Sequence, residues 1–286
     1  MIRFLLAHYD IPMGTEWFIL LQGCSNDHIT KVQSILTTLL TDGHSQQIHD
    51  GHLLVHNSTI TIHLLLSPTN LGLSKGMNIL NVAVRDFKYV LLLEDDWIAL
   101  PTAILETTTL LPRDWISLTL NFLDYHPTVS TIFLRRYRDE KEKNQFGWSR
   151  GIPYRCHHHQ NNFNYADKMK GSWKIPFHSL SFQQIPDFLF TFNPHIRRNE
   201  DYYRANVFPL PEFADINSKQ DKWTITKEGD CPDWGSTEAL SMEKTRHLVT
   251  FNMNQGVFGH FEDFEQILNQ LPLFTTEENA NRLPAV

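Results

Sequence analysis

A run of apolar residues that passes directly into three carboxylates is the sharpest change of hydrophobicity in the chain. The run is Tyr89–Leu93, and the acids are Glu94, Asp95 and Asp96. An apolar run of this length is typical of a strand buried on both faces of a parallel sheet. Unpaired carboxylates are costly in a dry interior, so these acids must reach solvent, a cation or a ligand. Ligands of open α/β sheets bind beyond the carboxyl ends of the strands, where we expect the acids to lie.

The pattern before this run alternates between strand and helix periodicity. It predicts a strand over 17–22 and then a helix from Asp27 to about Leu40, capped by Asn26 or Asp27. Strands follow over Leu53–Asn57 and Thr59–Leu66. A turn-rich loop over Ser67–Asn78 then leads into a helix that includes Met77, Leu80 and Val84. Repeated βα units imply a parallel sheet with helices on both faces. We therefore predict that residues 15–100 form a nucleotide-binding α/β half.

The second half of the chain has weaker periodicity. It predicts helices over 102–111 and 115–125 and a strand over 129–134. A solvated run of charged residues over 135–150 and an irregular span over 151–230 follow. The chain then has a loop entering a helix over 232–246 and a mobile polar tail over 275–286. The irregular span is rich in aromatic residues, which disordered segments lack, so we interpret residues 101–270 as an acceptor-binding half. The fold class is α/β, in one domain.

Composition narrows the classes of function. The 286 residues carry a net charge of −7, which excludes a broad basic face for nucleic acid. Three cysteines, far apart and odd in number, indicate a reducing compartment. The first apolar run is too short for a signal peptide, and no run has the roughly 20 residues of a membrane helix. We expect a soluble cytoplasmic protein without a membrane span.

The three acids suit a hard divalent cation. Clustered carboxylate oxygens favour Mg²⁺ or Mn²⁺. The alternative is that Asp95 or Asp96 only caps a following helix, which explains one acid easily and three poorly. Cys156 and the three histidines after it could in principle bind zinc, but no spaced partner set accompanies them, so a polar loop is favoured.

These segments carry a resemblance to a known family. The acid-tipped strand, preceded by Asn70-x-Gly72 and Lys75-Gly76-x-Asn78, resembles the GT-A-fold glycosyltransferases that use nucleotide sugars. Glu94-Asp95-Asp96 is similar to the Glu-Asp-Asp variant of their DxD motif in N-acetylglucosaminyltransferase I, and the Asn/Gly loop looks like that of the inverting family 2. The chain also resembles the soluble glycosyltransferases of large DNA viruses or bacteria. A viral enzyme of this kind would work in the host cytoplasm.

The resemblance implies roles at the donor site. Asp96 would bind the metal directly, and Glu94 and Asp95 would contact metal-bound water, the ribose or sugar hydroxyls. His260 looks like the carboxyl-terminal histidine that joins the metal site in several of these enzymes, although a lone histidine is as easily structural. The nucleotide would bind at the following loop residues, of which Lys75 could equally be a surface cation: Gln22, Gly23, Cys24, Asn70 and Lys75.

The resemblance also implies a catalytic base. The stretch from Trp234 to Arg246 resembles the family 2 segment that carries an acidic base, so Glu238 is the predicted base and Asp233 the reserve. Ala239 stands where a second acid often follows, which is a departure from the family pattern. Glu238 could instead be an acid in the first turn of a helix, where it would favour the helix dipole.

The sequence therefore predicts a metal-dependent, inverting glycosyltransferase. It would move a sugar from a nucleoside diphosphate donor, a UDP-sugar by expectation, to a hydroxyl of a glycan or glycoconjugate, with Mn²⁺ or Mg²⁺ as cofactor. Two alternatives stay open: a metal-dependent phosphohydrolase or nucleotidyltransferase, and a non-catalytic carbohydrate-binding protein.

Overall fold

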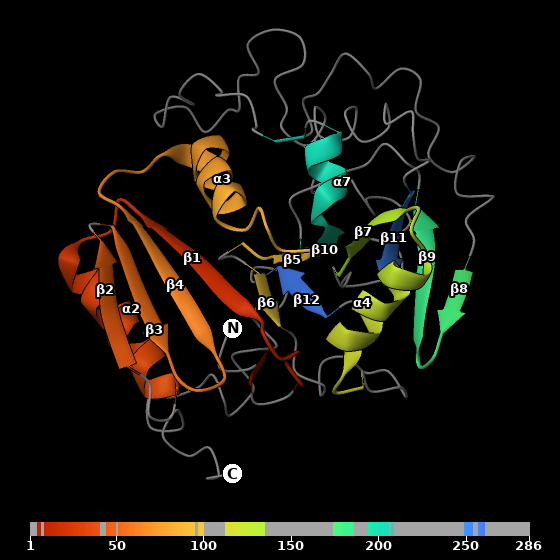
Figure 1. Ribbon diagram of the computed structural model, residues 1–286, viewed down its shortest axis with the longest axis horizontal. Coiled ribbons are helices and arrows are strands. Elements are labelled where there is room, and N and C mark those ends of the chain that lie inside the picture. Colours follow the sequence, from red (N-terminus) through yellow and green to blue (C-terminus); the bar gives the residue numbers. More distant parts are fainter. Residues whose placement is uncertain are drawn as a thin grey trace, which may run out of the picture.

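The protein is a mixed α/β molecule in which helices pack against β-sheets (Figure 1). The computed structural model describes residues 5–6, 9–40, 44–49, 51–94, 97–99, 112–134, 174–185, 194–205, 207–208, 249–253 and 257–260. Within these residues the strands form a four-stranded, a six-stranded and a two-stranded sheet. None of the described helices combines the length and the hydropathy that crossing a membrane requires.

The four-stranded sheet is built from the first part of the chain. Its strands, in spatial order, are β1 (Glu16–Gln22), β4 (Thr61–Ser67), β3 (His52–His56) and β2 (His44–His49). β1 and β4 are parallel, whereas β4, β3 and β2 follow one another as antiparallel hairpins. Helix α2 (Asn26–Leu39) packs on one face, where a cluster of aliphatic side chains is buried: Leu36, Leu40, Val55, Ile62 and Leu64.

The start of α2 differs from the prediction. We expected Asn26 or Asp27 to be the N-cap, but this was wrong, because both residues already lie in the helix. Ser25 is the cap, and its Oγ accepts a hydrogen bond from the backbone N–H of His28 at 3.3 Å. A serine at this position satisfies one of the orphan donors of the first turn.

The six-stranded sheet combines the middle and the end of the chain. Its strands, in spatial order, are β5 (Tyr89–Leu92), β10 (His195–Arg198), β7 (Val129–Phe133), β11 (Val249–Met253), β9 (Leu180–Ile185) and β8 (Lys174–Phe177). Helix α4 (Trp115–Tyr125) contributes Trp115 and Phe122 to the main core, where they are fully buried together with Ile132 and Phe182. The short helix α7 (Asn199–Arg204) follows β10 directly.

Helix α3 (Gly72–Ala83) contacts both of these sheets. Near its start, Gly76 lies against Leu20 and Gln22 of β1. Near its end, Asn81 is hydrogen-bonded to Arg197 of β10. Figure 1 shows α3 and α7 on the same side of the molecule, at the top of the view, with α7 above β10. The two-stranded sheet pairs β6 (Trp97–Ala99) with β12 (Phe258–His260).

Several predicted elements are confirmed. The strands expected over 17–22, 53–57, 59–66, 89–93 and 129–134 and the helices expected over 27–40 and 115–125 are all present, with ends shifted by a few residues at most. The helix expected around Met77 and Leu80 is also present, and Val84 is its C-cap. The helix at 102–111, the charge run at 135–150, the segment 232–246 and the tail lie outside the described residues.

The expected mostly parallel sheet is not confirmed. Among the described strands only β1 with β4 and β7 with β11 are parallel, and the remaining pairs are antiparallel. One reason is local: Asn57 Oδ1 accepts hydrogen bonds from the N–H groups of Thr59 and Ile60, which closes a turn too short for a parallel crossover. The expectation of an irregular span over 151–230 was also wrong in part, because β8, β9, β10 and α7 lie within it.

Candidate functional site

Two predicted nucleotide-binding loops meet at the carboxyl ends of β1 and β4. The backbone N–H of Gly23 donates to the carbonyl of Ser67 at 2.9 Å. Oε1 of Gln22 accepts a hydrogen bond from the N–H of Leu71 at 3.0 Å. The structure therefore brings Gln22, Gly23 and Cys24 next to the loop that carries Asn70, as the sequence predicted.

Glycine permits a close approach at two points of this junction. Gly23 has φ of +65°, and a Cβ atom there would lie 3.1 Å from the backbone nitrogen of Asn70. A Cβ atom on Gly76 would lie 3.0 Å from Nε2 of Gln22 and 3.2 Å from Leu20. Glycine thus allows the two loops, and helix α3 with strand β1, to approach more closely than a larger residue would.

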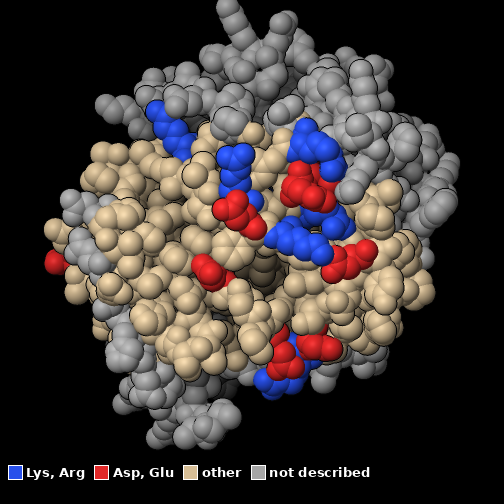
Figure 2. All heavy atoms as spheres, viewed as in Figure 1, with Lys and Arg blue, Asp and Glu red and all other residues tan. Residues whose placement is uncertain are grey.

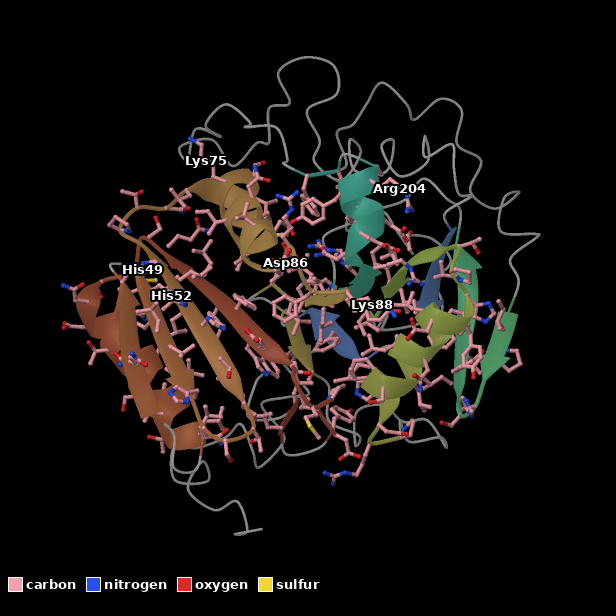
Figure 3. The ribbon with its side chains drawn as sticks, viewed as in Figure 1. His49, His52, Lys75, Asp86, Lys88 and Arg204 are labelled. Carbon is pink, nitrogen blue, oxygen red and sulfur yellow. The ribbon has the colours of Figure 1, made fainter. Side chains whose placement is uncertain are left out.

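The first turn of α3 faces the end of this junction. Asn70 Oδ1 accepts a hydrogen bond from the N–H of Gly72 at 2.9 Å, and the first turn contains no acidic residue. Lys75 is exposed on this turn, at the end of α3 that lies away from the core (Figure 3). A helix N-terminus and a nearby lysine both favour an anionic group. Cys24 is a free, partly buried thiol whose Sγ lies 3.7 Å from the carbonyl of Gln22.

The acid-tipped strand is present, but the expectation that it is buried on both faces of a parallel sheet was wrong. Among the described strands β5 lies at the edge of its sheet, is antiparallel to β10, and is mostly only partly buried. β5 ends at Leu92, and Glu94 follows it as a partly buried residue. The N–H of Trp97 donates to the carbonyl of Glu94 at 3.4 Å, and β6 begins at Trp97. Asp95 and Asp96 lie outside the described residues, so their predicted roles stay predictions.

The pairing of β6 with β12 joins two distant parts of the chain. His260 is the partner of Trp97 in this antiparallel ladder, and Gly259 and Phe258 pair with Ile98 and Ala99. Paired residues of antiparallel strands have Cα atoms about 4.5–5.5 Å apart. The backbone of His260 is thus next to the residue that directly follows Asp96 in the sequence, although the side chain of His260 is outside the described atoms.

The predicted catalytic base is not placed. Glu238, Asp233 and the Cys156–His159 cluster all lie outside the described residues, so the structure does not test them. Within the described part of the chain, no three Cys, His, Asp or Glu side chains are grouped so that they could hold a metal ion. The predicted metal ligand Asp96 is not among the side chains covered by that statement.

A buried polar centre, which the sequence did not reveal, lies between α3, β10 and α7. Arg197 is fully buried, donates to Oδ1 of Asn81, and places its guanidinium carbon 4.9 Å from the ring centre of Tyr202 and 4.7 Å from that of Phe208. Burial lowers the pKa of Arg197 to about 10, because the charged form loses its hydration. Its Nε and NH1 have no hydrogen-bond partner among the described groups. A charged residue in a strand normally indicates an exposed position, so no sequence signal pointed to this centre.

Charged side chains of opposite sign gather over α7 and β10. Figure 2 shows acidic and basic atoms side by side in this region. Arg198 Nε lies 3.5 Å from the carboxylate of Asp201, and Arg204 pairs with the same carboxylate. Lys88 Nζ lies 2.6 Å from Oδ1 of Asp124. Arg198 and Asp201 are buried, so the exposed charges are those in Figure 2, where the described part of this face has no broad area of a single sign.

Comparison of the chain with protein-family models, with curated proteins and with solved structures found no match in any of the three. The functional argument accordingly depends on the residues of this chain.

Proposed function

We propose that the protein is a metal-dependent glycosyltransferase that uses a nucleoside diphosphate sugar, in the first instance a UDP-sugar. The observation that supports this most is the pairing of β12 with β6. It brings the backbone of His260 next to Trp97, the first residue of β6 and three residues after Glu94. The family resemblance implies that Asp96 and His260 bind one metal ion, and the pairing supports this because it brings the backbones of these two chain segments together.

Asp96 and His260 are the proposed metal ligands. The donor set, carboxylate oxygen with imidazole nitrogen, suits Mn²⁺ well and Mg²⁺ less well, because imidazole is a softer ligand than oxygen. When bound, the ion would neutralise charge on the departing diphosphate as a Lewis acid. Glu94 is partly buried beside this edge and would orient water or donor hydroxyls around it.

The donor nucleotide would bind at the junction of the β1 and β4 loops. Gln22 is held there by its bond to the N–H of Leu71, and Gly23 lets the two loops lie in contact. The first turn of α3 and the exposed Lys75 add positive potential for phosphate oxygens. Both strand ends belong to the parallel pair β1 and β4, an edge at which ligands commonly bind.

Glu238 is the proposed base for the acceptor. A carboxylate near the attacking hydroxyl can accept its proton as the new glycosidic bond forms. Direct attack of this kind inverts the anomeric centre, and Asp233 is the reserve for the same role. The GT-A fold and the inverting outcome both belong to this proposal and rest on the sequence resemblance.

A thermal-shift screen of nucleotide sugars with and without Mn²⁺ tests the proposal. A true donor should raise the melting temperature only when Mn²⁺ is present, because a ligand of the folded state stabilises by mass action. Asp96→Ala and His260→Ala should each lose this shift, whereas Asp86→Ala, at an exposed position outside the site (Figure 3), should keep it. A shift that chelator leaves unchanged, or that both site variants retain, would contradict the proposal.

Product analysis separates the remaining possibilities. Transfer should release nucleoside diphosphate and extend an added glycan acceptor. Release of sugar phosphate, or turnover that no acceptor increases, would instead indicate a phosphohydrolase or nucleotidyltransferase. Binding of free sugar without any binding of nucleotide sugar would indicate a carbohydrate-binding protein.

A further inference from the structure

A chain of hydrogen-bonded side chains crosses the face of the four-stranded sheet opposite to α2. Nε2 of His52 on β3 lies 3.0 Å from Nδ1 of His63 on β4. Nε2 of His63 lies 2.9 Å from Oε2 of Glu16 on β1. His49 at the end of β2 places its ring centre 5.1 Å from that of His52 (Figure 3). Four ionisable groups from four strands therefore gather on one face.

The carboxylate determines where the protons lie. Ionised Glu16 can only accept, so Nε2 of His63 must be the donor in that bond. In neutral His63 the other ring nitrogen, Nδ1, then carries a free lone pair. His52 must donate from Nε2 to this lone pair. A single proton therefore lies between His52 Nε2 and His63 Nδ1.

The surroundings hold the His63 ring in this orientation. Phe18 stacks on it with ring centres 4.4 Å apart and an interplanar angle of 3°. The side chain of His63 is 17% exposed, so the ring is sheltered but still within reach of solvent. A histidine that is fixed by a carboxylate on one nitrogen and has a lone pair on the other is the usual arrangement of a metal-ligating imidazole.

We propose that His52 and His63 form a binding site for a divalent transition metal of the zinc type, in which the metal ion replaces the proton between the two ring nitrogens. His52 changes tautomer as the ion binds: Nε2 gives its proton to solvent and Nδ1 takes a proton from solvent, so the ring stays neutral and no oxidation or reduction takes place. Two nitrogens bound to one tetrahedral ion at about 2.0–2.1 Å lie roughly 3.3 Å apart, so the observed pair must open by a few tenths of an ångström, and the rings must turn until both lone pairs point at the ion. Glu16 would make His63 a better ligand by accepting its other proton.

The coordination sphere and its selectivity follow from the neighbouring groups. The described residues contain no converging set of three ligating side chains, so we propose solvent as the remaining ligands; the ring centre of His49 lies 5.1 Å from that of His52. Imidazole nitrogen favours zinc, copper and nickel, whereas Mg²⁺ prefers oxygen. The site is therefore chemically different from the proposed donor site and does not depend on that proposal. A metal ion here would cross-link β3 to β4 and stabilise the hairpin.

Zinc titration of the tag-free, EDTA-treated protein, followed by calorimetry and thermal shift, tests this inference. Wild type should bind one equivalent of Zn²⁺ that both His52→Gln and His63→Gln lose. His56→Gln removes another histidine of β3 and should keep it, as should Asp96→Ala. Binding should weaken in acid, because protons compete with the metal ion for the imidazole nitrogens.

Glu16→Gln provides a second test that leaves both histidines in place. It should lower zinc affinity about 10-fold to 100-fold, as loss of an orienting carboxylate does in other sites. Cu²⁺ bound to the wild type should show the electron spin resonance couplings of two imidazole nitrogens. Equal zinc stoichiometry in wild type, His52→Gln and His63→Gln, or a copper spectrum that these substitutions leave unchanged, would overturn the proposal.

Discussion

Gly23 lies so close to Asn70 that a Cβ atom on the glycine would come within 3.1 Å of the asparagine backbone nitrogen. This contact joins the loop after β1 to the loop after β4. Gly23 also adopts φ of +65°, a left-handed conformation that side chains disfavour. Two separate costs therefore oppose any larger residue at this position.

Gly23→Ala should lower the free energy of unfolding by more than backbone strain alone explains. The left-handed conformation costs about 1–2 kcal/mol for a residue with a Cβ atom. Gly14 has φ of +79°, and a Cβ atom there would have no neighbour within 4 Å, so Gly14→Ala is a matched control that carries the strain only. Urea denaturation of both variants measures the difference. Equal losses would show that the two loops can separate at no cost.

The sequence predicted the elements that depend on a pattern within one segment better than the features that depend on partners far away in the chain. The helix at Trp115–Tyr125 was found because its apolar positions recur at helical spacing within a single segment. β2, with the sequence His-Ser-Gln-Gln-Ile-His, has no apolar alternation and was missed. Strand direction was also missed, because it depends on connections and partners rather than on the pattern within a strand.

In the candidate site, too, the residues next to recognisable strands were predicted, whereas a residue that depends on a distant partner was not. Gln22, Gly23 and Asn70 were predicted as one group, since each follows a recognisable strand. Arg197 was not predicted, because its partner Asn81 lies far away in the sequence and only folding brings them together. Its burial could be learned only from coordinates.

Arg197 should tolerate methionine better than alanine. Arg197→Ala removes packing against Tyr202 and Phe208 and leaves a void, for which about 2–5 kcal/mol of lost stability is typical in cores. Arg197→Met keeps most of the volume and removes a charge that has no acidic partner among the described residues. Replacing buried charge by an apolar side chain is often neutral or stabilising. Guanidinium denaturation of Arg197→Ala and Arg197→Met measures the free energy of unfolding of each variant. An equally large loss for Arg197→Met would indicate a counter-charge in another part of the chain.

Asp124 should give a small contribution to stability that is lost in acid. Lys88 Nζ and the hydroxyl of Tyr89 both donate to its Oδ1, and they lower its pKa from the ordinary value of 3.8. Since the folded-state pKa lies below the unfolded one, the stabilisation is complete above about pH 5 and is lost as the pH falls through the carboxyl range. Both Lys88 and Asp124 are largely exposed, so the effect should not exceed about 1 kcal/mol.

Denaturation of wild type and Asp124→Asn at a series of pH values measures this contribution. The difference between them should be present at neutral pH and should diminish as the pH falls below 3.8, towards the lowered pKa of the folded state. Lys88→Met should reproduce part of the loss over the same range. A difference that persists in acid would show that Asp124 acts through its shape or hydrogen bonds rather than its charge.

The proposed donor site makes a quantitative prediction about Asp96 and His260. If both bind one Mn²⁺ ion, their effects on Mn²⁺ affinity should be coupled, by an energy in the range of about 0.5–3 kcal/mol that neighbouring groups show. The double variant Asp96→Ala/His260→Ala should then lose less than the sum of the single losses. The control pair Asp96→Ala/His52→Gln joins residues of two different proposed sites and should be additive within about 0.3–0.5 kcal/mol. Mn²⁺ titration in the presence of UDP, followed by electron spin resonance, measures all the variants. Additive losses for Asp96 and His260 would mean that the pairing of β12 with β6 serves the fold and that His260 does not bind the ion.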